Sequence, residues 1–201
     1  MHKVLARIAC LLTALLFCIA PAAAATPAET FISGNIQTGL TILNDKQLTP
    51  AQRATQFEAF LLGVTDLKRI ALFTLGPAAN TASPADRDAY MLAFQNYAIA
   101  VYQSYLAKYS GQTLTVLHSK ENAPGDVIVT TQLNDPNGHA PLQIDFRVSL
   151  TGPKPAIVDF RVEGVWIALA QHDDFAAVLA KSNGDIPALI AHLRAITAQY
   201  H

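Results

Sequence analysis

Cysteine is almost absent from this chain, and its placement limits what it can do. Both cysteines, Cys10 and Cys18, lie within residues 1–25, which have the pattern of a targeting segment. The remainder, residues 26–201, contains none. Once the segment is removed, the protein therefore has no disulfide, no cysteine nucleophile and no thiolate metal site.

The targeting segment has the three regions of a secretory signal peptide. Lys3 and Arg7 form a positive start, residues 8–20 are apolar, and small residues follow that allow cleavage after Ala24 or Ala25. As a helix, the apolar run would span about 20 Å, whereas a membrane hydrocarbon core is about 30 Å thick. We therefore expect export and cleavage rather than retention as an anchor.

The chain also lacks an excess of positive charge. Without the two cations of the signal peptide, 12 of its 14 Lys and Arg residues remain, against 15 Asp and Glu. Surfaces that bind nucleic acid are strongly basic because they neutralise phosphates. A weakly acidic chain therefore argues against nucleic acid as a partner.

Catalytic motifs are absent as well. The sequence has no Gly-x-Ser-x-Gly, no His-Glu-x-x-His, no phosphate-binding glycine loop and no cluster of Cys and His. The run His172-Asp173-Asp174 contains metal-ligand residue types, but adjacent helical residues point apart, and its acids suit the start of a helix. We predict no catalytic residue, no metal site and no cofactor.

What the sequence does contain is a strong β-hairpin pattern. Apolar and polar residues alternate over residues 142–150 and again over 156–163, on either side of Thr-Gly-Pro-Lys-Pro. This period of two predicts antiparallel strands joined by a five-residue turn. If position 150 faces 156, the predicted pairs are Phe146–Phe160 and Val148–Val158.

The same register makes the other face of the hairpin a ladder of opposite charges. Arg147 would lie opposite Asp159, and Asp145 opposite Arg161. Each acid then has a cross-strand cation, so we interpret them as a solvated ladder rather than an acid–base pair. An enzyme would need an ionisable residue on the apolar face, where the alternation of the hairpin places none.

Helical periodicity precedes the strands and returns after them. The predicted helices cover residues 26–44, 50–64, 66–75, 83–111, 172–182 and 186–200, and two further strands cover 112–118 and 126–133. This order indicates one α+β domain over residues 26–201, with helices packed on a twisted four-stranded antiparallel sheet.

From Gln52 onward the sequence also resembles a known family, MlaC and the toluene-tolerance proteins. The longest similar stretch is Val158-Asp159-Phe160-Arg161-Val162-Glu163-Gly164-Val165. The other similar positions are Arg53, Phe57, Phe60, Leu61, Ile70-Ala71-Leu72, Leu75-Gly76, Ala82-Ser83, Phe94, Tyr105, Leu106, Tyr109, Phe175 and Gly184-Asp185. The chain departs from the family at Pro155, Trp166 and His172, where the family usually has Trp, Ser and Arg. It resembles a divergent branch associated with hopanoid-synthesis loci.

The resemblance implies a soluble periplasmic lipid carrier that is not an enzyme. Members hold acyl chains in an apolar cavity between the sheet and the helices. They pass lipid between an ABC transporter with an MCE-type protein at the inner membrane and a lipoprotein complex at the outer membrane, which maintains outer-membrane lipid asymmetry. For this chain we expect a monomer that binds a phospholipid or a hopanoid-type lipid.

Our hypothesis is that the apolar face of the hairpin and the aromatic stripe of the longest helix line this cavity. The candidate lipid-binding residues are Phe73, Phe94, Tyr97, Val101, Tyr105, Val116, Val129, Ile144, Phe146, Val148, Val158, Phe160 and Val162. Cores and apolar pockets share this composition, so each residue also fits plain core packing.

Two other classes of protein remain open. One is a small secreted enzyme with an isomerase-like cavity in an α+β scaffold, which would need an ionisable residue pointing inward. The other is a non-catalytic protein-binding module with a filled core. The presence of an apolar cavity would separate the carrier from this second class.

Overall fold

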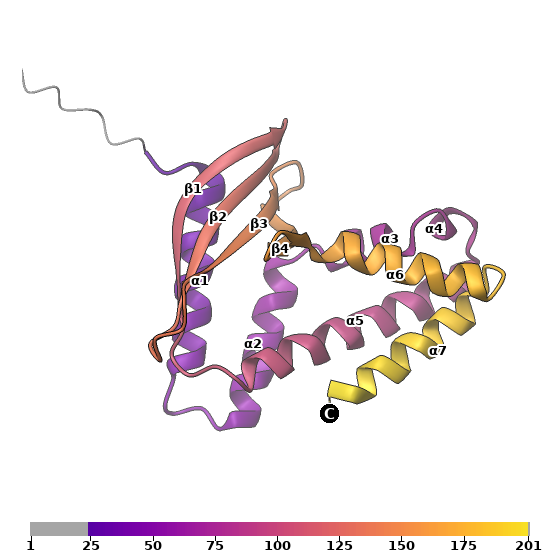
Figure 1. The fold of residues 1–201 in the computed structure, drawn as a ribbon, viewed down its shortest axis with the longest axis horizontal. Helices are drawn as coiled ribbons and strands as arrows, with labels where there is room; N and C mark the ends of the chain where they lie inside the picture. The colour runs from indigo at the N-terminus through magenta and orange to yellow at the C-terminus, as the bar shows by residue number, and fades with distance from the viewer. Residues whose placement is uncertain (1–23, 201) are drawn as a thin grey trace, which may run out of the picture.

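The computed structural model describes residues 24–200 (Figure 1). Both cysteines lie outside the described residues. So does the predicted signal peptide, except for its last one or two residues, Ala24 and Ala25. The helices are α1 (Pro27–Asn44), α2 (Pro50–Val64), α3 (Leu67–Leu75), α4 (Ala78–Thr81), α5 (Pro84–Leu106), α6 (Ile167–Lys181), α7 (Ile186–Thr197) and the 3₁₀ turn η1 (Ala198–Tyr200). The strands are β1 (Thr113–Ala123), β2 (Asp126–Asn134), β3 (Leu142–Ser149), β4 (Ala156–Val162) and β5 (Val165–Trp166).

Most long helices begin at a capping residue that is visible in the sequence. Thr26 and Thr49 accept hydrogen bonds from the backbone N–H three residues further on, and each forms a full capping box. Ser83 and Asp185 cap α5 and α7 in the same way, and both helices have proline in the first turn. The predicted starts of α2, α5 and α7 are therefore confirmed.

The strands form one antiparallel meander in the order β1-β2-β3-β4-β5, so the α+β fold class is confirmed. The sheet has five strands rather than the predicted four. The additional strand β5 has two residues and pairs with the end of β4 across Glu163 and Gly164. Both turn residues have positive φ, 50° and 83°, as a two-residue type I′ hairpin requires. Helix α6 follows at Ile167, before the predicted start at His172.

The pairing of β3 with β4 confirms most of the predicted register. The pairs Phe146–Phe160, Arg147–Asp159 and Asp145–Arg161 are all present. Val148 lies opposite Ile157 rather than Val158, because the register shifts after Arg147. The prediction for this pair was wrong. A β-bulge adds one residue to β4 at this point, and the alternation of polar and apolar residues gives no sign of it.

The two acids of the charged face are buried, contrary to the predicted solvated ladder, whereas Arg147 and Arg161 are partly exposed. Asp145 is 2% exposed. Arg161 donates to it from Nε at 2.8 Å and from Nη2 at 2.6 Å. Burial alone would raise the pKa of Asp145, but hydrogen bonds from Thr130 and Arg161 outweigh it, so this pKa lies below its usual value. The ion pair therefore belongs to the packed structure.

Asp159 has a structural role that alternation could not reveal. The N-cap residue of α6, Trp166, makes no side-chain capping bond. Asp159 Oδ1 on the adjacent strand instead accepts from the Ala168 backbone N–H at 2.9 Å. The cation expected opposite it, Arg147, pairs with Asp126 at 2.6 Å. Burial raises the pKa of Asp159 above its ordinary value.

Two hydrophobic cores lie on opposite sides of the molecule (Figure 1). One joins α1 to the sheet around Ile32, Val129 and Val148. The other joins α3, α5, α6 and α7 around Tyr90 and Phe175. Helix α2 packs against α1 and α5 between them and has no buried residue. The two cores do not meet, and α2 borders the space that is left between them.

Candidate functional site: an apolar cavity between the sheet and helices α1 and α2

A cavity of ≈ 260 Å³ separates the sheet from α1 and α2. Its apolar lining comes from α1 (Ile32, Ile36, Gly39, Leu40, Leu43), from α2 (Phe57, Phe60, Leu61, Val64) and from the sheet (Leu114, Leu133, Phe146, Ile157). An apolar cavity of about 150 Å³ stays dry and binds benzene. This cavity has room for a longer hydrocarbon.

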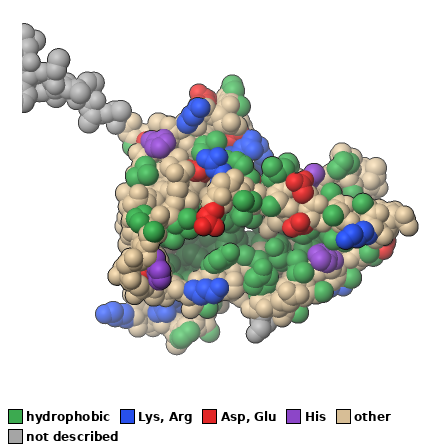
Figure 2. All heavy atoms as spheres, viewed as in Figure 1, with side chains coloured by type: hydrophobic (Ala, Val, Ile, Leu, Met, Phe, Trp, Pro, Cys, Tyr) green, Lys and Arg blue, Asp and Glu red, His purple; other side chains and the backbone are tan. Residues whose placement is uncertain are grey.

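The polar residues of the wall, Asn35, Tyr109 and Gln112, are bonded to other protein groups. Asn35 Nδ2 donates to the Phe31 carbonyl at 2.8 Å, and Gln112 Nε2 donates to Asp135 at 3.2 Å. The Tyr109 hydroxyl lies 3.1 Å from Asn44 Nδ2. Each of the three residues therefore makes a hydrogen bond without a ligand, and the cavity suits an apolar one. Figure 2 shows a hollow with a hydrophobic floor between the sheet and the helices on the face in view.

Glycine at position 39 makes room for the cavity. A Cβ placed on Gly39 would lie 3.3 Å from Phe60 Cε1 and 3.6 Å from Phe57 Cε2. The two phenylalanine rings pack on each other, with centroids 5.7 Å apart. A larger residue at position 39 would therefore push these rings into the cavity.

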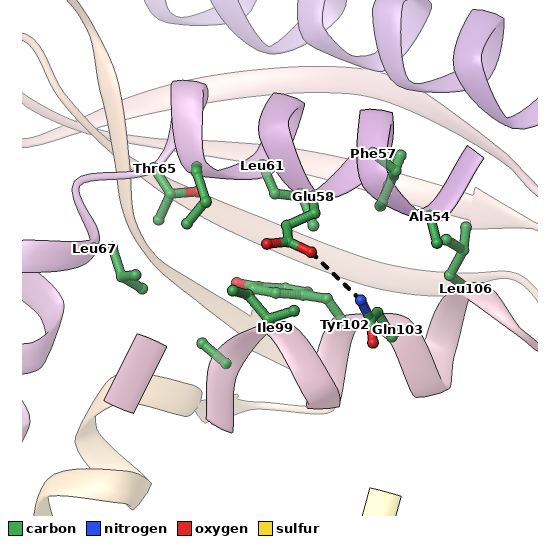
Figure 3. Close-up of a pocket in the computed structure, with 12 residues that line it drawn as sticks. Ala54, Phe57, Glu58, Leu61, Thr65, Leu67, Ile99, Tyr102, Gln103 and Leu106 are labelled. Atoms are coloured by element: carbon green, nitrogen blue, oxygen red, sulfur yellow. Dashed lines mark hydrogen bonds between the residues drawn. The ribbon is translucent and has the colours of Figure 1, made fainter. Parts of the chain in front are cut away.

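A narrow seam between α2 and α5 lies behind the same wall (Figure 3). Phe57 and Leu61 line both the seam and the cavity. The seam encloses only ≈ 20 Å³. Glu58 reaches across it to Gln103 Nε2 at 3.5 Å, beside the Tyr102 ring. One side-chain layer of α2 is all that divides the cavity from this seam.

Tyr102 lines both the seam and a crevice formed by α3, α5, α6 and β4. Burial and the nearby charge of Asp159 raise the pKa of Tyr102 to about 12. The crevice encloses ≈ 40 Å³, enough for a few waters at about 10–15 Å³ each. This space beside Asp159 is too small for an organic substrate. The carboxylate acts as the helix cap described above.

The predicted lipid-binding residues of the sheet differ in whether they line the cavity or pack beside it. Phe146 lines the cavity. Val116, Val129 and Val148 pack in the adjoining core between the sheet and α1. Ile144 and Val162 pair on the same face of the sheet and are half-buried, while Val158 is buried.

The predicted residues of the helices lie elsewhere. Phe94 and Tyr97 belong to the helical core. Tyr105 is 65% exposed, and Phe73 is exposed with its ring against His172. Val101 lines the small crevice beside Asp159, and so does Phe160 of the sheet, which lies on β4. The structure therefore does not gather the aromatic stripe of α5 around the large cavity.

The cavity-lining residues of α1 were not among the predicted candidates, although a signal was present. Ile32, Ile36, Leu40 and Leu43 recur at helical spacing and form one stripe of α1. Sequence reasoning assigned the stripe to a helix but not to a cavity. Its partner surface, α2 and the ends of β1 and β2, comes together only in the folded chain.

Comparison with known proteins places this geometry in a family. The family model described as MlaC protein matches residues 34–195. The chain belongs to the MlaC family. Among solved structures, it is similar to a phospholipid-binding protein from Ralstonia solanacearum in complex with a phospholipid, with a TM-score of 0.75 and 24% sequence identity. That match covers 87% of this chain and 99% of the other, so it shows that the two share the MlaC fold.

Within residues 24–200, no helix combines the length and apolarity that a membrane crossing requires. The same residues contain no group of three or more His, Cys, Asp or Glu side chains placed to hold a metal ion. His172, which the sequence placed at a helix start, lies inside α6 and bonds to its neighbour Asp173 at 3.0 Å.

Proposed function

We propose that this MlaC-family protein is a soluble periplasmic lipid carrier whose cavity holds the acyl chains of a phospholipid. The observation that carries the proposal is the apolar cavity of ≈ 260 Å³ between the sheet, α1 and α2. Family membership and the phospholipid bound to the Ralstonia relative support the choice of ligand. The acyl-chain contacts that we propose are Phe146 and the lining residues of α1 and α2.

The physical need for such a carrier is large. Burial of each CH₂ group is worth about 0.8 kcal/mol, so exposing a 16-carbon chain to water costs about 13 kcal/mol. A free lipid therefore crosses an aqueous compartment very slowly. A dry cavity behind a loosely packed helix replaces the membrane interior during transit, and a small net charge lets the carrier leave either membrane.

The proposal extends to location and partners. The signal-like pattern of residues 1–25 supports export to the periplasm. There the protein would exchange lipid with an ABC transporter and its MCE-type protein at the inner membrane and with a lipoprotein complex at the outer membrane. The proposed carrier performs no chemical step, and the residues that line its cavity include no Asp, Glu, His or Lys.

The test is native mass spectrometry of the mature protein released from a periplasmic extract, with the bound molecules identified. We expect one phospholipid per chain. A hopanoid-type lipid would establish the same carrier with the alternative, polycyclic cargo. A mass equal to the bare chain, unchanged after incubation with phospholipid vesicles, would contradict the proposal and favour a protein-binding module.

A further inference from the structure

A second, polar pocket lies where the chain passes from α2 to α3 across the edge of β4. It encloses ≈ 310 Å³ and includes Leu62, Gly63 and Ala156 in its lining. Its polar side chains are Thr65, Asp66, Arg69, Ser149, Thr151 and Lys154. The turn between β3 and β4 forms one wall, and the end of α2 and the start of α3 form the other.

Two cations line this pocket, and neither forms an ion pair within 4 Å among the described residues. The charge of Arg69 also acts on Asp126 and helps to lower the pKa of that carboxyl. Arg69 Nη1 donates to Ser149 Oγ at 3.0 Å, which leaves most of its guanidinium N–H groups unused. Lys154 Nζ donates to the Gly63 carbonyl at 2.8 Å and has two further donors. Arg147 and Arg161, by contrast, are paired with buried acids.

The remaining groups of the pocket leave these cations available. Asp66 is its only carboxylate, and it accepts the Arg69 backbone N–H at 3.0 Å as the cap of α3. The hydroxyls of Ser149 and Thr151 lie 3.0 Å from each other. The pocket therefore combines two cations with several hydroxyls and one acid already engaged by backbone. Such a donor set suits a phosphate, because guanidinium and ammonium groups form strong charge-assisted hydrogen bonds with it.

The pocket and the apolar cavity share neighbouring parts of the chain. Val64 and Ile157 line the cavity, whereas Thr65 and Ala156 line the polar pocket. Consecutive Cα atoms are about 3.8 Å apart. The two walls meet where Thr65 bridges Ile157 and the Asp66 N–H donates to the Ile157 carbonyl at 2.9 Å. A phosphate held here would therefore lie across this backbone contact from the wall of the cavity.

We propose that this polar pocket binds a phosphate group, with Arg69 and Lys154 as its principal ligands. As the headgroup site of the carried lipid, it rests on the proposed function; as a site for free phosphate, it does not. In the first case the pocket distinguishes phosphate-bearing lipids from neutral lipids with the same chains.

The test compares dioleoyl phosphatidic acid with dioleoylglycerol, which differ only in the phosphate. Binding of each to lipid-free mature protein is titrated by native mass spectrometry, and inorganic phosphate is titrated by calorimetry. We expect the wild type to prefer the phosphatidic acid by at least about tenfold, because two charge-assisted contacts are gained. R69Q/K154Q should lose this preference and keep its affinity for dioleoylglycerol.

The matched control is K68Q/K120Q, which removes two exposed cations outside the pocket and should keep the preference. If R69Q/K154Q fails to fold, K154Q alone serves, since Lys154 lies in an exposed turn. The pocket is assigned to free phosphate if the wild type binds inorganic phosphate, the variant does not, and the wild type shows no preference between the two lipids. A preference unchanged in the pocket variant overturns the inference.

The two proposals fail differently. If the wild type binds neither lipid, the proposed carrier function fails, and the calorimetric titration alone decides the pocket. Binding of both lipids equally, with no heat from inorganic phosphate, overturns the phosphate site and leaves the carrier intact.

Discussion

At the residue scale, Asp159 shows how one carboxylate joins two elements. It lies on β4 but accepts from the backbone N–H of Ala168 in the first turn of α6. A second bond, from the Phe160 N–H at 2.8 Å, holds the carboxylate in place. Helix α6 therefore begins at Ile167 because the sheet supplies its cap.

Replacing Asp159 by alanine should lower the free energy of unfolding by about 1–2 kcal/mol, as loss of a helix cap usually does. Asp159→Asn should cost less, because its amide oxygen can still accept from Ala168 and the buried charge is removed. Urea unfolding followed by circular dichroism measures both. Equal losses in the two variants would contradict the capping role.

Two glycines of α1 provide a matched pair that tests the cavity. A Cβ on Gly39 would meet Phe57 and Phe60, whereas a Cβ on Gly34 has nothing within 4 Å. Gly39→Leu should push the two rings into the cavity and abolish stoichiometric lipid binding in native mass spectrometry. Gly34→Leu should bind lipid as the wild type does.

Both glycine substitutions gain helix propensity, roughly 0.5–1 kcal/mol for a residue with a side chain. Gly34→Leu should therefore be at least as stable as the wild type. Full lipid occupancy in a folded Gly39→Leu variant would show that the ligand lies elsewhere, and the seam between α2 and α5 would become the next candidate.

At the scale of elements, α2 differs from its neighbours. It has no buried residue, although Phe57, Phe60 and Leu61 point toward other elements. α5 and α7 contain buried residues along their length. A helix held by partly exposed contacts opens at a lower free energy than one in a packed core.

In lipid-free protein, backbone amides of α2 should exchange with solvent at least about tenfold faster than those of α5, because local opening costs less there. Bound lipid should slow exchange in α2 more than in α7, since α2 lines the cavity and α7 does not. Hydrogen exchange with mass spectrometry of both forms makes the measurement. Protection of α2 that is equal to that of α5, with and without lipid, would show that α2 is a fixed wall.

At the scale of the whole molecule, the helical core and the cavity wall are built from different residues. The helical core contains no residue of the cavity wall. Leu189 is fully buried in it, whereas Leu40 is a half-buried residue of the wall. Deleting side-chain volume in each place should affect different properties of the protein.

Leu189→Ala should lower the free energy of unfolding by about 2–5 kcal/mol, the usual range for a buried leucine, and leave lipid affinity unchanged in the folded protein. Leu40→Ala should cost less stability and weaken lipid binding. Thermal unfolding and lipid titration of both variants test the separation. Loss of lipid affinity in folded Leu189→Ala would show that the helical core and the cavity are coupled.

Features that depend on short-range order were predictable from the chain alone. Proline after Thr49 or Ser83 signals a helix start because it fits the first turn, and the alternation over residues 142–163 signals strands because side chains of a strand point to opposite faces. Charge opposite charge and Phe opposite Phe then specified the register of β3 and β4 as far as Arg147, where the β-bulge shifts it. The α+β fold class followed from these local signals, whereas the family resemblance rested on short matching stretches such as residues 158–165.

Features that depend on which surfaces meet were decided only by the tertiary structure. The stripe of α1 is visible in the sequence, but whether it meets a filled core or a space depends on Gly39, Phe57 and Phe60 coming together. In the same way, Asp145 was expected in water and is buried. Polarity patterns record which side chains share a face of an element, while burial, cavities and long-range caps depend on what the fold places against that face.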